Sequence, residues 1–577
     1  MNASMDLINK NKRLSSNTDL GTQVVSFIVL LNGLVIILTT LLSQTAFRHH
    51  FIRITDLSID LRLGVGLVLI YLSNLLRRRK RTAWLAAIIA YGFYLGINLD
   101  SIGDMIGTRS IGFQPFIRYA VLPILVILLL LINQKKFVVR SDRQGIATAI
   151  RMSVLILLTT LVYGTVGYLI LGRSGFHEHL GLGRSVHYTI DQLNITTAHS
   201  LTAYTRRAKI FQDSLTFISI GAIVYIIVSF FQPIRSRIVG QTSERERFRE
   251  LMWQQGNASS EDYFKLWPPD KLYFFSSDGK SALAYQVYHG SAVILGGPNG
   301  NPRSFDKLLT EFGYVCYGND WRPSIVHCED ENRELFESHG YKMQKLGQEA
   351  VVDIDSFLAY YPKDKYFRQI QNKFNRYGYT TEFFGPPHHE ALMTRLKQIS
   401  DEWLSVGNRA ERGFAMGYFS YEYMNNCEVM VARDAAGTIQ AFINLVPAEF
   451  DHKEATYDLL RHSKEAMTNV NDFLLINFAV ELKNRGYEKI NLGLCPLAGL
   501  DEDDENAGLI DNVFKFAYSN GDRFYSFKGL YKFKNKYQPV WRDRYLAYQG
   551  GLRGFSKSMN ALLQTMKRST GKLYRRN

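Results

Sequence analysis

The sequence predicts a chain of two fold classes, an α-helical transmembrane part followed by a mixed α/β part. Two observations predict this division of the 577 residues. Before about residue 235, six apolar runs each approach the roughly 20 residues that a membrane-spanning helix needs. After Trp253, shorter segments with strand-like and helix-like periods alternate. In addition, a formal net charge of +15 favours an anionic partner, either nucleic acid or a phospholipid surface.

The apolar runs predict six spans, and their basic flanks predict the orientation. Lys10 and Lys12 precede the first run, RRRKR separates the second from the third, and QKKFVVR separates the fourth from the fifth. Because basic loops stay on the cytoplasmic side, we expect a multi-pass cell-membrane protein whose residues after about 240 are cytoplasmic. The six runs are Val24–Leu42, Leu63–Leu76, Trp84–Leu99, Tyr119–Asn133, Val154–Leu171 and Leu215–Phe231.

The cytoplasmic part predicts two rounds of α/β structure, each a sheet covered by helices. We therefore expect a transmembrane anchor domain over 1–240, a first α/β domain over 241–365, and a second over 366–577 that ends in a basic tail. A strand, strand, helix, strand order is typical of acetyltransferase-like folds, among other α/β arrangements. Segments read as first-round strands are KLYFFSS, ALAYQVY, SAVILGG, FGYVCYG and SIVHC; DKYFRQIQNKFNRYGY and NDFLLINFAVELKNRGY read as helices, and EVMVARD, TIQAFINLVPA and KINLGLCPL as second-round strands.

Lysines and aromatic residues alternate in the stretch FKGLYKFKNKYQPVW, Phe527–Trp541. Lys532, Lys534 and Lys536 occupy every second position, with rings between them. This period predicts a strand with ammonium groups on one face and a packed aromatic wall on the other.

Three longer stretches carry a family resemblance: YDLLRH (Tyr457–His462), NDFLLINFAVELKNRGYEKINLGLCPLAGL (Asn471–Leu500) and FYSFKGLYKFKNKYQPVWRDRYLAY (Phe524–Tyr548). In this order they resemble the aminoacyl-phosphatidylglycerol synthases, also called phosphatidylglycerol lysyltransferases or multiple peptide resistance factors. The resemblance implies a tandem acetyltransferase-like (GNAT-like) fold. Long members of the family have about fourteen spans, of which eight form a flippase, so six spans lead us to expect a short form without the full flippase domain.

The resemblance implies transfer of an amino acid from aminoacyl-tRNA to the glycerol hydroxyl of phosphatidylglycerol. We expect lysine first, from lysyl-tRNA, and alanine next. This transfer would lower the negative charge of the membrane and give resistance to cationic antimicrobial peptides. An aminoacyl ester is already activated, so the reaction needs positioning, proton removal and cations, and we expect neither a cofactor nor a metal.

The resemblance also implies the catalytic residues. Asp458 and Arg461 in YDLLR match the family's catalytic pair, and their spacing predicts one face of a helical turn. Asp458 would bind the substrate's α-ammonium or accept the hydroxyl proton, and Arg461 would orient the substrate or bind phosphate. Without the resemblance, the pair reads as a surface ion pair of little energetic value. Lys534 is the expected catalytic cation near the aminoacylated end of the tRNA.

Other residues are secondary candidates. Lys528, Lys536, Glu402 and Asp472 are expected to bind substrate, although Asp472 also fits a helix N-cap. Arg368 and Arg376 lie at helical spacing and could meet tRNA phosphates, whereas such a charge run is more often a solvated face.

Two alternatives stay open at this point. One is tRNA-dependent transfer to another lipid or to a cell-wall acceptor. The other is a membrane transporter with a regulatory lipid-binding module, which the absence of an acid–base pair from the predicted spans disfavours. Association into a homo-oligomer is also left open.

Overall fold

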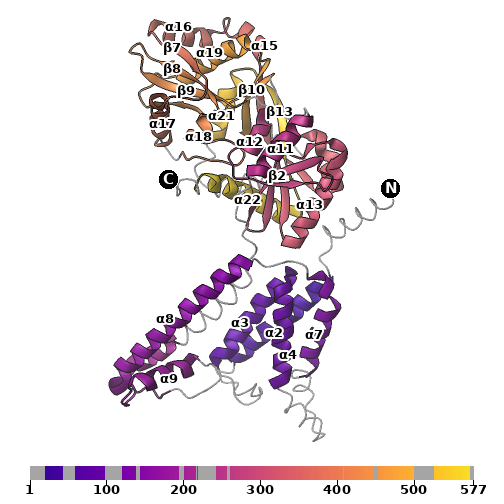
Figure 1. Ribbon diagram of the computed structural model, residues 1–577, viewed down its shortest axis with the longest axis vertical. Coiled ribbons are helices and arrows are strands. Elements are labelled where there is room, and N and C mark those ends of the chain that lie inside the picture. The colour runs from indigo at the N-terminus through magenta and orange to yellow at the C-terminus, as the bar shows by residue number, and fades with distance from the viewer. Residues whose placement is uncertain are drawn as a thin grey trace. The chain divides into compact units, whose positions relative to one another are not determined.

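The computed structural model describes residues 20–42, 59–97, 120–137, 143–193, 201–215, 218, 242–255, 260–406, 409–447, 453–499 and 526–571. These residues form two compact units (Figure 1). The helical unit lies within Ser16–Ser236, and the α/β unit lies within Arg237–Asn577. Each unit is described by itself below.

Helices occupy five of the six predicted runs of the helical unit. Two stretches, Leu20–Leu38 and Val154–Gly175, have both the length and the mean hydropathy, 2.2, of a membrane span. Large apolar side chains on them are exposed, as on Val162 and Ile170, which suits contact with lipid. The sixth run, Leu215–Phe231, falls mostly outside the described residues, so the six-span arrangement stays a prediction. The helices are α2 (Leu20–Leu42), α3 (Ile59–Arg77), α4 (Arg81–Ile97), α7 (Leu122–Ile132), α8 (Arg143–Gly175) and α9 (Leu182–Leu193).

A nine-stranded mixed sheet organises the α/β unit. Its order is β1 (Leu272–Phe275), β2 (Ser281–Tyr288), β3 (Ser291–Leu295), β5 (Arg322–Cys328), β13 (Val540–Tyr548), β6 (Lys342–Asp353), β12 (Lys489–Pro496) and β10 (Glu454–Thr456), with β4 (Asn299–Gly300) paired to β2. The pairs β3–β5 and β10–β12 are parallel. Strand β13, from near the end of the chain, lies between β5 and β6, so the sheet contains strands from both sides of residue 365. The domain boundary expected there stays a prediction.

A second, antiparallel sheet has the order β11 (Leu460–His462), β9 (Ile439–Leu445), β8 (Glu428–Arg433) and β7 (Thr380–Phe384). Helices α16 (Lys365–Arg376) and α19 (Val470–Asn484) pack on it through a shared apolar core. The same core contains side chains of β6 and β12, and it thereby joins the second sheet to the large one. The α/β class predicted for this half of the chain is confirmed.

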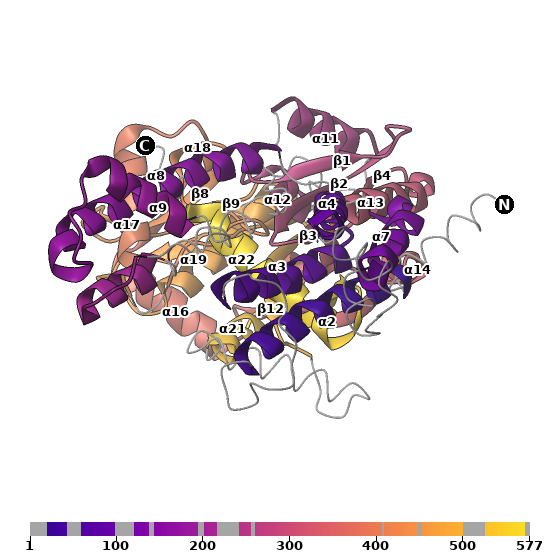
Figure 2. The same cartoon turned by 90° about the horizontal axis from the view of Figure 1, so that it is seen from below.

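Helices cover the two sheets. The C-terminal helix α22 (Gly551–Gly571) crosses β2, β3, β5 and β13 (Figure 2) and buries Phe555 and Ala561. The other helices are α11 (Thr242–Gln255), α12 (Tyr263–Leu266), α13 (Phe305–Asn319), α14 (Arg333–Ser338), α15 (Ile354–Tyr360), α17 (Glu390–Leu404), α18 (Tyr421–Met424) and α21 (Ser526–Asn535), with short 3-10 turns at Ser260–Asp262, Pro302–Ser304 and Asp330–Asn332.

Two segments predicted as strands are helices. FGYVCYG belongs to α13, because Leu308, Phe312 and Cys316 recur every four residues and bury one face of that helix. The lysine-rich stretch begins as helix α21, and only its end belongs to β13. In α21 the inward side chains follow the helical period: Lys534 and Tyr537 are buried, and Phe533 is partly buried. The alternation of lysines and rings was therefore a misleading signal.

Candidate functional site

Asp458 lies in the turn between β10 and β11, so the helical turn expected for YDLLR is wrong. β10 continues the large sheet and β11 the small one, so this turn carries the chain from one sheet to the other. The hydroxyl of Tyr423 donates to Asp458 Oδ1 at 2.8 Å, and Asn444 Nδ2 donates to the same oxygen at 2.7 Å. Asn444 Oδ1 in turn accepts the backbone N–H of Leu459 at 2.8 Å, which fixes the turn.

The environment of Asp458 favours its neutral form. Burial raises the pKa of this carboxyl group above its usual value, although Asn444, Tyr423 and Arg461 each lower it. Gly417 packs against the other oxygen, since a Cβ atom at Gly417 would lie only 2.1 Å from Asp458 Oδ2. A carboxyl group with a raised pKa in a polar cluster suits a general base or an orienting group.

Arg461 lies in β11, and its partner is Glu411 rather than Asp458. The guanidinium is paired through both nitrogens, Nη1 to Oε1 at 2.8 Å and Nη2 to Oε2 at 2.7 Å. Both side chains are largely buried, and Nη1 also donates to Ser400 Oγ. The ring of Trp403 lies 5.1 Å from the guanidinium carbon. This bidentate geometry fixes the orientation of Arg461.

Lys534 projects from α21 onto β12 and lies in a second polar cluster. Its Nζ donates to the carbonyl oxygens of Gly493 at 2.8 Å and Leu494 at 3.0 Å. The register of β12 against β6 shifts between Asn491 and Leu494, and Gly493 adopts a φ of +80°, which presents these carbonyls to the lysine. Burial lowers the pKa of Lys534 to about 8, although nearby Cys495 and the carboxyl groups of Glu261 and Glu349 raise it.

The carboxyl groups beside Lys534 belong to a buried charge network. Arg544 Nη2 lies 2.6 Å from Glu349 Oε2, and Glu349 is fully buried. Burial and the neighbouring Glu349 raise the pKa of Glu261, whereas Glu261 and Arg544 outweigh burial and lower the pKa of Glu349. Asn491 links Glu261 to Glu454, with Nδ2 at 3.3 Å from an oxygen of each.

The same network contains a group with the spacing of a metal site. Side-chain ligand atoms of Glu261, His327 and Glu349 all lie within 4.8 Å of one another. The guanidinium of Arg544 already supplies a positive charge to Glu349. Since this fixed charge opposes a divalent cation, the residues suit proton sharing better than metal binding.

Asp472 is the centre of a third cluster, on α19. Its Oδ1 accepts from Lys536 Nζ at 2.6 Å and from the Tyr537 hydroxyl at 2.6 Å, and its Oδ2 accepts from the Tyr366 hydroxyl at 3.0 Å. Lys536 also lies 4.5 Å from the ring centroid of Phe533. The structure therefore brings the predicted substrate residues Asp472 and Lys536 together, but as partners of each other.

The remaining candidates lie elsewhere. Glu402 Oε2 accepts the backbone N–H of Lys464 at 3.0 Å. Arg368 and Arg376 are exposed on α16. Lys528 is in α21, and its side chain lies outside the described residues. Asp458, with the neighbouring Arg461, and Lys534 thus occupy distinct clusters, and each keeps its predicted role as a proposal.

Sequence reasoning missed the groups that hold these candidates. Tyr423, Asn444 and Gly417 come from separate segments, and only tertiary structure brings them to Asp458. Glu411 lies in the family-like stretch DEWLSVGNRAERGFAMGYF, so its charge among apolar residues could have drawn notice. Glu261 gave no comparable signal.

Comparisons with known proteins agree with this architecture. A relative from Bacillus subtilis named phosphatidylglycerol lysyltransferase is 30% identical over 505 residues, which cover 85% of this chain and 53% of that protein. A Staphylococcus epidermidis protein of the same name is 30% identical over 290 residues, covering 49% of this chain and 33% of that one. The chain thus spans about half the length of the first relative and a third of the second.

A solved structure matches the α/β unit. It is the C-terminal domain of a protein from Agrobacterium fabrum named as a candidate lysylphosphatidylglycerol synthetase, 29% identical with a TM-score of 0.50. The match covers 57% of this chain and 98% of that domain. The family model described as the C-terminal part of phosphatidylglycerol lysyltransferase matches residues 249–548, just over half of the 577 residues. This chain therefore belongs to the phosphatidylglycerol lysyltransferase family.

Proposed function

We propose that the chain is a membrane-bound enzyme that moves an amino acid from aminoacyl-tRNA to the glycerol hydroxyl of phosphatidylglycerol. The observation that carries the proposal is the Asp458 cluster: within the family-matched region, Asp458 is held by Tyr423 and Asn444, and its pKa is raised by burial. The names of the relatives favour lysine as the amino acid, with alanine as the second candidate.

In this proposal the donor is lysyl-tRNA, and its ester bond supplies the driving force. The glycerol hydroxyl attacks the ester carbonyl carbon, the hydroxyl proton leaves, and the ribose oxygen departs. Asp458 accepts that proton or holds the α-ammonium group, and Arg461, fixed by Glu411, orients the substrate. Lys534, with its pKa of about 8, supplies positive charge near the terminal adenosine or the developing oxyanion.

The membrane assignment is part of the same proposal. Two helices have the length and hydropathy of spans, and the other predicted runs would bring the total to six. The α/β unit would then be cytoplasmic, where charged tRNA is available, with its two halves arranged as tandem acetyltransferase-like domains. Lysine added to the headgroup would reverse its charge, which weakens the attraction of cationic peptides.

The test uses the purified full chain, vesicles of phosphatidylglycerol, and tRNA charged separately with radiolabelled lysine or alanine. We expect label in the lipid fraction with one of the two amino acids, and its loss in Asp458→Ala and Lys534→Ala. Matched controls are Asp401→Ala on α17 and Lys532→Ala on α21, since both side chains are exposed. Absence of label with both amino acids would contradict the proposal and favour another acceptor.

A further inference from the structure

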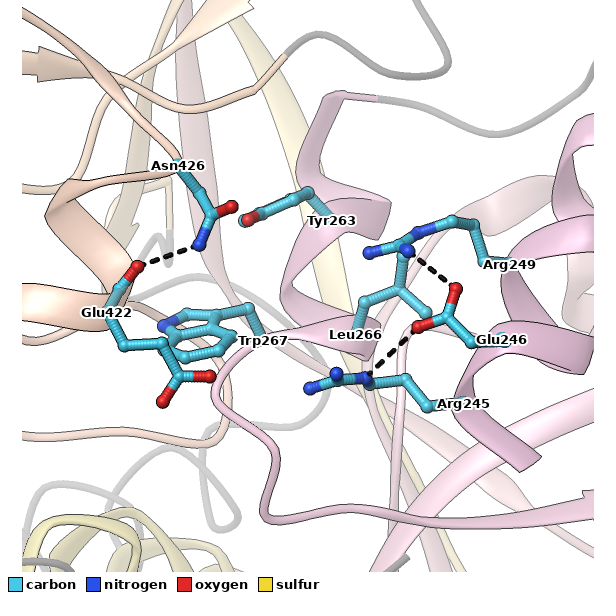
Figure 3. Close-up of a pocket in the computed structure, with 8 residues that line it drawn as sticks. All are labelled: Arg245, Glu246, Arg249, Tyr263, Leu266, Trp267, Glu422 and Asn426. Carbon is cyan, nitrogen blue, oxygen red and sulfur yellow. Dashed lines mark hydrogen bonds and ion pairs between the residues drawn. The ribbon is translucent and has the colours of Figure 1, made fainter. Parts of the chain in front are cut away.

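A cavity of about 250 Å³ opens close to the Asp458 cluster (Figure 3). One wall is α11, and the others are the segment around α12 and the helix α18. Figure 3 shows two guanidinium groups that point from α11 toward Tyr263 and Trp267. The lining residues are Arg245, Glu246, Arg249, Tyr263, Leu266, Trp267, Glu422 and Asn426.

Two aromatic rings connect the cavity to Asp458. The indole of Trp267 stacks on the ring of Tyr423, with a centroid separation of 5.8 Å and an interplanar angle of 9°. Tyr423 then donates its hydroxyl to Asp458. A group bound in the cavity would therefore lie one stacked pair of rings away from the proposed base.

The cavity wall contains donors without acceptors. Within the part of the chain that the structure describes, Arg245 Nε and Trp267 Nε1 are both buried and make no hydrogen bond. The oxygen paired with Arg245 Nε, Glu246 Oε1, is 3.7 Å away, which is too long for a hydrogen bond. Because buried donors without acceptors are costly, the wall suits a ligand that brings oxygen acceptors.

Charge narrows the ligand class. Glu246 lies between the two arginines and is 2.6 Å from Arg249 Nη1 (Figure 3), so α11 offers two guanidinium groups to one carboxylate. Guanidinium groups bind phosphate oxygens through paired donors. Opposite them, Asn426 Nδ2 is held by the backbone carbonyl of Glu422 at 2.7 Å, and the side chains of both residues are exposed at the rim.

We propose that this cavity binds the phosphodiester of the acceptor lipid's headgroup, an inference that rests on the proposed function. Arg245 and Arg249 hold the phosphate oxygens, and the glycerol end of the headgroup extends toward Asp458. The lipid is favoured over RNA by chain connectivity. Thr242, the first residue of α11, follows the end of the last predicted span, Phe231, by eleven residues, which is about 40 Å at most when extended.

Kinetics with proteoliposomes of graded phosphatidylglycerol content test the assignment. We expect Arg245→Gln and Arg249→Gln to raise the KM for phosphatidylglycerol about tenfold, and to leave kcat and the KM for aminoacyl-tRNA within about twofold of wild type. Arg245→Lys should restore part of the affinity, which also shows that the site can be filled by a folded variant. An unchanged lipid KM, or a raised KM for aminoacyl-tRNA instead, would overturn the proposal.

Arg247→Gln is the matched control. Arg247 lies on the same helix, but its guanidinium stacks on the ring of Phe275, 4.1 Å from the centroid, outside the cavity. The same charge is removed from α11, so a general electrostatic effect of the helix on the membrane would appear in this variant too. An equal KM increase in Arg247→Gln would therefore overturn the site assignment.

A binding measurement separates this inference from the proposed reaction. Calorimetric titration of the detergent-purified full chain with water-soluble glycerophosphoglycerol requires no turnover. We expect binding that Arg245→Gln loses and Arg247→Gln keeps, and weaker binding of inorganic phosphate and glycerophosphocholine. This result with no amino acid transfer would sink the proposed function alone. Lack of binding by wild type, or equal binding of all three probes, would sink the headgroup site.

Discussion

The hydroxyl of Tyr423 donates a hydrogen bond to Asp458 at 2.8 Å, and Tyr423 itself is fully buried. The bond is one of the contributions that lower the pKa of Asp458, against the larger effect of burial that raises it. The balance between these effects decides how much of the carboxyl group is ionised at neutral pH, and so how much proposed base is available.

Tyr423→Phe tests this balance because it removes the donor and keeps the ring. With one stabilising bond lost, the pKa of Asp458 should rise further, so the acid limb of the kcat profile should move to higher pH. The measurement is the pH dependence of kcat for amino acid transfer. Tyr421→Phe, at an exposed neighbour, should leave the profile unchanged. An acid limb that stays in place would show that ionisation of Asp458 does not limit the reaction.

The ion pair of Arg461 and Glu411 gives a second prediction. Glu411→Gln leaves a largely buried guanidinium without its carboxylate, so the free energy of unfolding should fall by about 3 kcal/mol. The displaced Arg461 should also lower transfer. Denaturant unfolding of the purified chain measures the first effect. The control Glu382→Gln breaks a more exposed pair with Arg433, for which we expect about 0.5 kcal/mol. Similar losses in both variants would contradict a special role for burial.

Much of the α/β half could be predicted from sequence because its strands and helices have strong local periods. KINLGLCPL and SAVILGG became β12 and β3. The lysine-rich stretch failed because the same letters fit two periods, and tertiary packing of Lys534 and Tyr537 selected the helix. YDLLR failed because β11 pairs with β9, a contact that no local pattern encodes.

The site could be predicted only in part for a related reason. Asp458, Arg461 and Lys534 stand in motifs, so resemblance found them. Their partners come from remote segments: Asn444 precedes Asp458 by 14 residues, and Glu411 precedes Arg461 by 50. A spacing rule could therefore suggest that Asp458 and Arg461 face each other, whereas in the structure each has other partners.

Lys534 gives a third prediction, which concerns pH. Its folded pKa is about 8, and an unfolded lysine has a pKa of about 10.4. Between these values the unfolded chain binds more protons, so the stability contributed by this site rises with pH. Compared with Lys534→Met, the wild-type thermal midpoint should therefore improve between pH 8 and pH 10. Lys532→Met, at an exposed lysine, should show no such trend.

The same titration bears on the role of Lys534 in transfer. If the lysine acts as a cation, the single-turnover rate should fall as the pH rises through about 8, because the ammonium group loses its proton. A rate that rises through this range and depends on Lys534 would contradict the cation role and indicate a neutral amine acting as a base.

Gly417 gives the last prediction, because it packs directly against the proposed base. A Cβ atom there would lie 2.1 Å from Asp458 Oδ2 and 2.5 Å from the ring of Tyr423, both far closer than real contacts. Gly417→Ala should therefore push the carboxylate out of place, lower transfer by at least tenfold, and cost about 1–3 kcal/mol of stability. The control is Gly385→Ala, where no atom lies within 4 Å of the added carbon. Wild-type rates in Gly417→Ala would mean that the position of Asp458 seen in the structure is not the one that the reaction uses.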